Sequence, residues 1–183
     1  AEGCEEHLRS PLRLANRADI DRIVLGGYWL NIPEGPARLK AIESLGELIR
    51  SLTQMRRVYL LLNIPAGPEY DPRNMFVGTR LTRLHAKKSP ASLDLNTFLR
   101  IYGAMRVGLR QAAEANGGIA IDPLPNLCPD GYCSVIAADG RPLYLDEHHM
   151  RPFHVVAAAT FIDETALGVS TLNLSVPLDR VQK

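Results

Sequence analysis

Short apolar runs alternate along this chain with longer segments whose apolar residues recur every three or four positions. Residues 22–27 (RIVLGG) and 57–63 (RVYLLLN) are nearly continuous apolar runs, which is typical of strands buried on both faces of a sheet. Residues 118–122 (GIAID) form a weaker run of the same kind. The three runs therefore predict three buried strands.

The segments between these runs have the periodicity of amphipathic helices. One apolar stripe lies between the first two strands and contains Leu39, Ile42, Leu45, Ile49 and Leu52. A second stripe, which Asn116-Gly117-Gly118 is expected to end, contains Leu95, Phe98, Tyr102, Met105, Leu109 and Ala112. A third helix is expected to begin near Pro152 and to continue to Ile162.

This alternation favours an α/β fold with right-handed crossovers, in which helices cover both faces of a mainly parallel sheet to give three layers, α/β/α. The 183 residues show no internal repeat or linker, so we expect a single domain, long enough to bury roughly 70% of its unfolded surface. Residues 65–90 are rich in Pro, Gly, Asn and Arg and predict a long loop, which in such folds often borders a site.

Charge and hydropathy exclude several classes of function. The chain carries 21 Lys and Arg against 20 Asp and Glu, a net charge of +1, and its positive residues are scattered, so nothing in the charge pattern favours binding to nucleic acid or an anionic membrane. The longest apolar stretch, residues 155–162, is far shorter than the roughly 18 residues of a membrane span. The acidic start, AEGCEEH, is unlike a signal peptide.

Two of the three cysteines, Cys128 and Cys133, enclose the turn-forming sequence Pro-Asp-Gly-Tyr. Such a loop can close a short disulfide, which would indicate an oxidising compartment. The alternatives are two ordinary buried thiols or half of a metal site, although no second pair of ligands lies close in the sequence. With a disulfide formed, Cys4 is left over, which suggests a partner outside this chain.

The segment 142–153 (PLYLDEHHMRPF) places two of the five histidines side by side, three residues after an aspartate. It precedes the third predicted helix, and active sites of open parallel sheets lie in loops of this kind. Asp146 can accept a hydrogen bond from one ring nitrogen of His149 and leave the other directed outward, as in a hydrolase triad. The alternatives are a helix-capping pair and a metal site of His148, His149 and a carboxylate. We expect His148 to point elsewhere, at the rim.

Five segments resemble, in order, the SGNH-type domain fused to membrane-bound acyltransferase-3 proteins, the bacterial polysaccharide and lipopolysaccharide O-acetyltransferases. They are CEEHLRSPL, DRIVLGGYW, RRVYLLLNIPAGP, IDPLPNLCPDGYC and DGRPLYLDEHHMRPF. The resemblance runs from Cys4 to about Ile162, and its most specific part is the cysteine pair followed by G-x-P-L-Y-x-D-x-x-H. It implies an SGNH hydrolase-like, flavodoxin-like fold.

The resemblance also implies roles for individual residues. The final motif supplies the catalytic Asp and His of the family, which correspond to Asp146 and His149. The cysteine pair corresponds to a family disulfide, here Cys128 with Cys133, and Cys4 resembles a cysteine whose partner lies upstream. The chain departs from the family after the motif, with Arg151 in place of Ser and His154 in place of Gly.

The nucleophile of the family is a serine in a Gly-Asp-Ser-His-like turn after the first strand, and no serine of this chain has that context. The serines are Ser10, Ser44, Ser51, Ser89, Ser92, Ser134, Ser170 and Ser175. We therefore expect this chain to lack the serine-bearing first strand and to be the C-terminal part of a larger protein. Because that strand lies inside the family's sheet, we also expect unpaired backbone groups beside residues 22–27.

A substrate or oxyanion role is predicted for Gly27, which ends the first run, and for Trp29, which follows it. Trp29 stands near the place where other SGNH enzymes carry an Asn that helps bind the oxyanion, although a Trp beside a strand end more often belongs to the core. The backbone of Gly26 or Gly27 can approach a substrate because no side chain blocks it. Asn63, at the end of its own run, is interpreted as a turn former rather than a site residue.

The resemblance implies an O-acyltransferase domain at the periplasmic face of the inner membrane, which moves an acetyl group onto a glycan hydroxyl by a Ser-His-Asp mechanism. No cofactor is expected in this domain; acetyl-CoA would be the ultimate donor, through an integral membrane partner domain. Two alternatives remain: a carbohydrate esterase, and a non-catalytic glycan-binding module on an SGNH scaffold.

Overall fold

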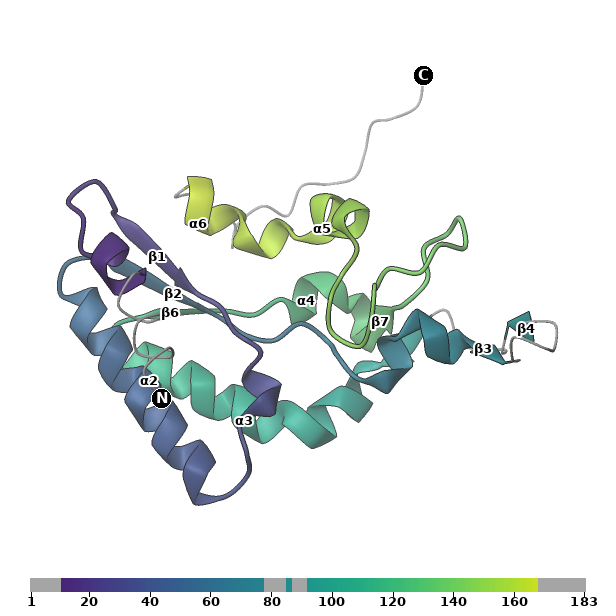
Figure 1. The fold of residues 1–183 in the computed structure, drawn as a ribbon, viewed down its shortest axis with the longest axis horizontal. Coiled ribbons are helices and arrows are strands. Elements are labelled where there is room, and N and C mark those ends of the chain that lie inside the picture. Colours follow the sequence, from purple (N-terminus) through teal and green to yellow (C-terminus); the bar gives the residue numbers. More distant parts are fainter. Residues whose placement is uncertain (1–10, 78–84, 87–91, 168–183) are drawn as a thin grey trace.

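The computed structural model describes residues 11–77, 85–86 and 92–167, and its centre is a parallel sheet of three strands (Figure 1). The strands are β1 (Arg22–Leu25), β2 (Arg57–Leu61) and β6 (Ile119–Ile121), in the order β1-β2-β6. Both pairings are parallel, with Val24 opposite Tyr59 and Leu60 opposite Ala120. All three predicted strands and their parallel arrangement are confirmed.

Helices lie on both sides of this sheet, so the three predicted layers are present (Figure 1). One side carries α2 (Pro36–Thr53) and α3 (Leu95–Ala115), which pack against each other and against the sheet. The other side carries α5 (Pro152–Ala158), the 3-10 turn η5 (Thr160–Ile162) and α6 (Asp163–Leu167). Shorter elements are η1 (Trp29–Asn31), α4 (Leu124–Leu127), η4 (Pro129–Gly131), β5 (Ser92–Asp94) and β7 (Tyr132–Ser134).

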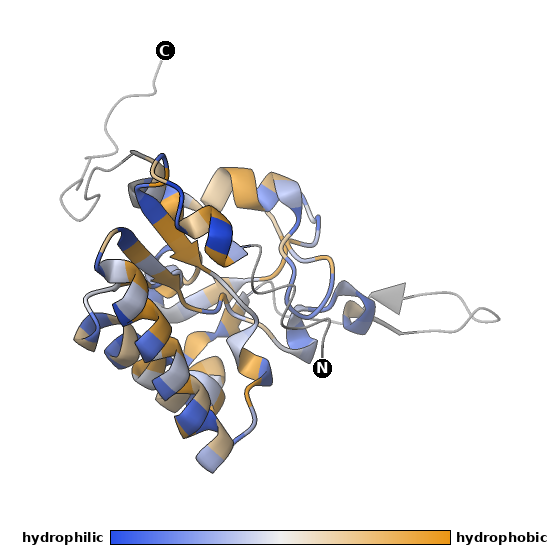
Figure 2. Ribbon diagram, turned by 60° about the vertical axis from the view of Figure 1, so that its left-hand side comes forward, coloured by the Kyte–Doolittle hydropathy of each residue, from blue (hydrophilic) through white to orange (hydrophobic). Residues whose placement is uncertain are grey.

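One of the core clusters fills the space between the sheet and the two long helices. Figure 2 shows the amphipathic pattern as blue and orange residues alternating along the helices. The buried side chains of this core are Ile49, Leu52, Val58, Leu60, Leu62, Met105, Leu109 and Ala113. The predicted stripes are therefore buried in the central turns of α3 and in the last turns of α2, at Ile49 and Leu52. Leu39 is 71% exposed because it lies in the first turn of α2, beyond the buried part of the stripe.

The first strand differs from its prediction as a strand buried on both faces. β1 pairs with β2 and with no other strand of the described residues, so it is an edge of the sheet. Val24, in its centre, is 46% exposed. The guanidinium of Arg22 donates to the carbonyl oxygens of Thr165 and Ala166, both at 3.0 Å, which ties the end of α6 to the beginning of β1.

The helix ends follow local chemistry in α3 and depart from the prediction in α5. The Asp94 carboxylate accepts a hydrogen bond from the backbone N–H of Asn96 at 2.9 Å and caps α3. Gly117, at φ +81°, turns the chain away after its other end, as predicted. The third helix ends at Ala158 instead of Ile162, because Ala159 leaves the helical conformation and Thr160 accepts a hydrogen bond from the Asn126 side chain.

The segment 65–90 was expected to be a long loop, and its described part contains short regular elements. They are the 3-10 helices η2 (Pro68–Tyr70) and η3 (Pro72–Met75) and an antiparallel pair of two-residue strands, β3 (Phe76–Val77) and β4 (His85–Ala86). Within the described ranges, no helix is both long and apolar enough to cross a lipid bilayer.

Candidate active site

The Asp-Glu-His-His sequence occupies a tight loop between β7 and α5. Tyr144 and Met150 form an antiparallel bridge at its base, and the backbone N–H of Leu145 donates to the carbonyl of His149 at 2.7 Å. Inside the loop, one carboxylate oxygen of Asp146 accepts the backbone N–H groups of His148 and His149, both at 2.9 Å. Asp146 therefore sets the shape of the loop, as short acidic side chains do in turns.

The same carboxylate holds the ring of His149. Its two oxygens lie 2.8 and 3.0 Å from Nδ1 of His149. The backbone N–H of His148 and then the His149 ring hold the pKa of the Asp146 carboxyl far below its usual range, so it is ionised and acts as an acceptor. Nδ1 of a neutral His149 then carries the proton, and the lone pair is on Nε2.

The His149 ring stands at the mouth of a cavity of about 230 Å³. Its side chain is 63% exposed, and within the described part of the chain no group bonds to Nε2. The cavity is lined by Gly27, Tyr28, Leu61, Leu62, Asn63, Ile64, Ala66, His148 and His149. Gly27 and Tyr28 follow the carboxyl end of β1, and Leu62, Asn63 and Ile64 follow the carboxyl end of β2. This is the position expected for an active site in a parallel sheet.

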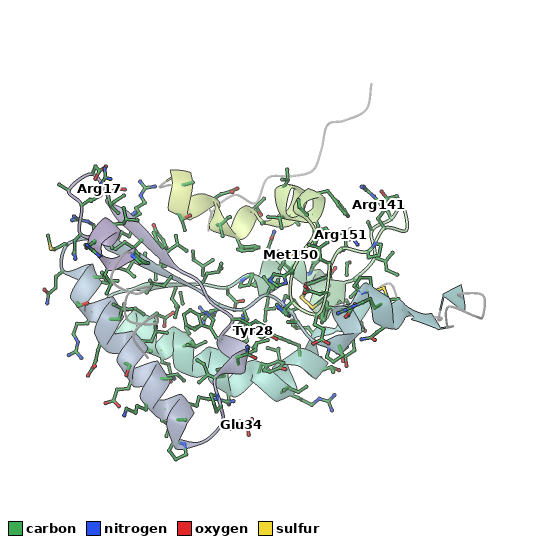
Figure 3. All side chains as sticks on the ribbon, in the orientation of Figure 1. Arg17, Tyr28, Glu34, Arg141, Met150 and Arg151 are labelled. Atoms are coloured by element: carbon green, nitrogen blue, oxygen red, sulfur yellow. A yellow bond between two sulfur atoms is a disulfide. The ribbon has the colours of Figure 1, made fainter. Side chains whose placement is uncertain are left out.

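His148 lies beside His149, and the expectation that it points elsewhere is wrong. The centroids of the two imidazole rings are 4.2 Å apart, and the centroid of the Tyr28 ring lies 4.6 Å from that of His148. Figure 3 labels Tyr28 in the turn between β1 and η1. The prediction failed because it assumed that neighbouring side chains diverge, whereas the loop carries both imidazoles along one wall of the cavity.

Of the two residues predicted after β1, only Gly27 reaches the cavity. The indole N–H of Trp29 donates to the carbonyl of Leu61 at 2.8 Å, and its ring packs against Gly27 and the core cluster between the sheet and the two long helices. Trp29 therefore fastens η1 to the end of β2 and belongs to the core. Gly27 lines the cavity, and in the described residues no backbone or side-chain acceptor bonds to its N–H.

Asn63 is a site residue that the sequence interpretation missed. It is 7% exposed, lines the cavity, and its amide nitrogen lies 3.4 Å from the carbonyl oxygen of Gly27. Its own carbonyl accepts from the buried guanidinium of Arg106, which also binds the Asp122 carboxylate. A polar residue at the carboxyl end of a buried strand was the signal that could have identified it.

The comparisons with known proteins agree with this arrangement. A family model described as "SGNH domain (fused to AT3 domains)" matches residues 1–162. The chain belongs to this family. The searches of curated proteins and of solved structures found no match to the chain.

The described serines of this SGNH domain lie away from the His149 cavity. Ser44 and Ser51 belong to α2, Ser92 to β5 and Ser134 to β7, and none lines the cavity. The other four serines, and Cys4, lie outside the described residues. The pair of Asp146 and His149 therefore forms with no serine lining its cavity among the residues that the structure describes.

The cysteine pair of this SGNH domain supports the site loop. Cys128 and Cys133 are joined by a disulfide, drawn as a yellow bond in Figure 3, and both are buried. Cys133 lies in β7, which pairs with β5. The carbonyl of Val135, just after β7, accepts from the N–H of Leu143 at 2.9 Å, so the disulfide-linked segment continues into the loop of Asp146.

Arg151 and His154 are the two residues at which the chain departs from the family pattern after the motif, and the structure shows their surroundings. The guanidinium Nε of Arg151 donates to the carbonyl of Tyr144 at 3.1 Å, and its backbone N–H donates to Leu143 at 2.8 Å, so Arg151 closes the base of the loop. His154, in the first turn of α5, is partly buried, and burial lowers its pKa. Both residues fit the packing of α5.

Proposed function

We propose that this SGNH domain transfers an acyl group, by the family resemblance acetyl, to a sugar hydroxyl, with His149 as general base and Asp146 as its orienting partner. The observation that carries the proposal is the 2.8 Å contact between Nδ1 of His149 and the Asp146 carboxylate, with Nε2 left at the mouth of a cavity. This is the geometry that a serine-dependent acyl transfer requires of its base.

In the proposed reaction, Nε2 of His149 accepts the proton of a serine hydroxyl while the serine oxygen attacks the acyl carbonyl. The proton then passes from Nε2 to the leaving group, and an acyl-serine remains. A sugar hydroxyl next gives its proton to Nε2 and attacks the acyl-serine, and the proton returns to the serine oxygen. Asp146 stays ionised throughout and stabilises the imidazolium that forms in each half-reaction.

The negative charge on the carbonyl oxygen needs donors in the same cavity. We assign the backbone N–H of Gly27 to this role because it lines the cavity and has no acceptor among the described residues. Asn63 lies beside it, with its amide nitrogen 3.4 Å from the Gly27 carbonyl. The two groups lie after adjacent strands, which fixes their separation.

The serine is proposed to come from a segment outside residues 1–183, on a strand that pairs with the open edge of β1. The exposure of Val24 and the single described neighbour of β1 support this position. A strand there would end next to Gly27 and would bring a serine at its carboxyl end toward His149. The proposed setting is the periplasmic side of the membrane, with a fused membrane domain that delivers acyl groups derived from acetyl-CoA.

The test uses the complete protein and measures the acyl groups on its glycan acceptor by mass spectrometry. His149→Gln is expected to lower the transfer rate by about 10³-fold or more, because loss of the base removes nearly all triad chemistry. His154→Gln is the matched control, since this histidine lies in α5 and does not line the cavity.

The same preparations distinguish transfer from hydrolysis. A transferase forms the sugar ester, whereas an esterase releases the free acid at the same rate with or without the sugar. Full transfer activity in His149→Gln would contradict the assignment of the base, and release of the free acid alone would assign the domain as an esterase.

A further inference from the structure

The side chains of Asp146, His148 and His149 form a cluster that an acid-base pair alone does not require. Each offers one possible metal ligand, and the three ligand atoms lie within 4.8 Å of one another. Nδ1 of His148 is 3.7 Å from the Asp146 carboxylate, and Nδ1 of His149 is 2.8 Å from it. We propose that these three residues bind a Zn²⁺-type ion.

The separations fit a tetrahedral ion. Zn²⁺ bonds of about 2.0–2.2 Å place the ligand atoms of a tetrahedral site about 3.3–3.6 Å apart. From the single oxygen Oδ1 of Asp146, Nδ1 of His149 lies at 3.0 Å and Nδ1 of His148 at 3.7 Å, on either side of this range. All three ligand atoms lie within 4.8 Å of one another, so rotations of the two rings complete the ion's coordination sphere. Three protein ligands leave the fourth position open to the cavity, as in zinc sites that keep a water or a substrate group.

The burial of the Nδ1 atom of His148 gives an independent reason to propose a bound ion. This atom has no hydrogen-bond partner within the described residues. An unpaired buried nitrogen is unfavourable, and a metal bond would satisfy it. The proposed acyl transfer uses Nε2 of His149 and Asp146, and it leaves this nitrogen without a role.

The surroundings hold the three ligands in place. The backbone N–H groups of His148 and His149 fix the Asp146 carboxylate, and the Tyr28 ring packs against His148 at 4.6 Å. Two imidazoles with one carboxylate suit Zn²⁺, whereas Ca²⁺ and Mg²⁺ prefer sites made of oxygen atoms.

Metal binding and base catalysis exclude each other at His149. An ion on Nδ1 takes the place of the proton that Nδ1 donates to Asp146, so the ring loses the hydrogen bond that orients it. The metal site therefore makes Zn²⁺ a reversible inhibitor of the acid-base pair. Its binding can be measured on this chain without any acyl transfer, so the proposal is tested separately from the proposed function.

The experiment titrates ZnCl₂ into the metal-stripped chain by calorimetry at neutral pH, with a chromophoric chelator as competitor. One ion per chain is expected. His148→Ala and Asp146→Asn each remove a ligand and are expected to lower the affinity by at least about 10-fold. His154→Ala is the control, because this histidine is not part of the cluster, and its affinity is expected to match that of the unmodified chain.

Circular dichroism checks the fold of each variant, and His148→Gln replaces His148→Ala if the alanine variant unfolds. Absence of stoichiometric Zn²⁺ binding would overturn the proposal. Equal affinity in a folded His148 variant and the unmodified chain would also overturn it, because the ion would then be held by histidines elsewhere.

Discussion

Replacing Arg106 with Met tests whether the buried guanidinium holds the cavity wall together. Arg106 is only 5% exposed and donates to the backbone carbonyl of Asn63 and to the Asp122 carboxylate. Methionine fills the space of the aliphatic stem but makes neither bond. The carbonyl of Asn63 then lies buried without a donor, whereas Asp122 keeps Arg110 and the N–H of Leu124.

The expected loss follows from these contacts. A buried carbonyl left unpaired costs about 1–3 kcal/mol, and a hydrogen bond to a charged group contributes about 1.5–3 kcal/mol. Burial lowers the pKa of Arg106, so releasing the guanidinium from its buried site offsets part of this loss. We expect Arg106→Met to lower the free energy of unfolding by about 2–4 kcal/mol.

Equilibrium urea denaturation measures this change. With a slope of about 2 kcal/mol per molar urea, the midpoint is expected to fall by about 1–2 M. Arg110→Met is the control, because Arg110 binds the same carboxylate from a 38% exposed position and its loss should cost about 0–1 kcal/mol. Equal midpoints for the two variants would refute the reasoning, since burial would then make no difference.

Two further predictions concern the disulfide and the last helix. Mass spectrometry of the unreduced chain should find Cys128 bonded to Cys133, and reduction should cost about 2 kcal/mol, the chain-entropy value for so short a loop; two thiols that label without reductant would contradict this. Because burial lowers the pKa of His154, the folded state favours its neutral form, and the free energy of unfolding should fall as the pH drops below about 6.5. Urea midpoints at pH 7.5 and 5.5 should differ less in His154→Gln, and an unchanged difference would assign the effect to other groups.

The central sheet and its long helices could be predicted because local physics determines them. The run around Val58 has no polar face, so it fits only a buried strand, and the stripe from Phe98 to Leu109 repeats at the helical period. The exposure of Val24 could not be predicted in this way. It depends on which strand lies beside β1, and a single strand's own sequence does not specify its neighbour.

The candidate site was predictable in its chemistry and less so in its geometry. The spacing of Asp146 and His149 allowed the hydrogen bond that the structure contains. The placement of His148 beside it, and of Trp29 in the core, depends on side-chain directions that are set by contacts with Tyr28 and Leu61. Those contacts join segments distant in the sequence, so no local pattern encodes them.

The protonation state of the His149 ring tests its role as an oriented base most directly, and ¹⁵N NMR measures it on the metal-free chain with the ring neutral. We expect a proton on Nδ1 and a lone pair on Nε2, because the ionised Asp146 accepts from Nδ1. Asp146→Asn should move the proton to Nε2, since the amide can donate to Nδ1. A proton on Nε2 in the unmodified chain would contradict the assignment of His149 as an oriented base.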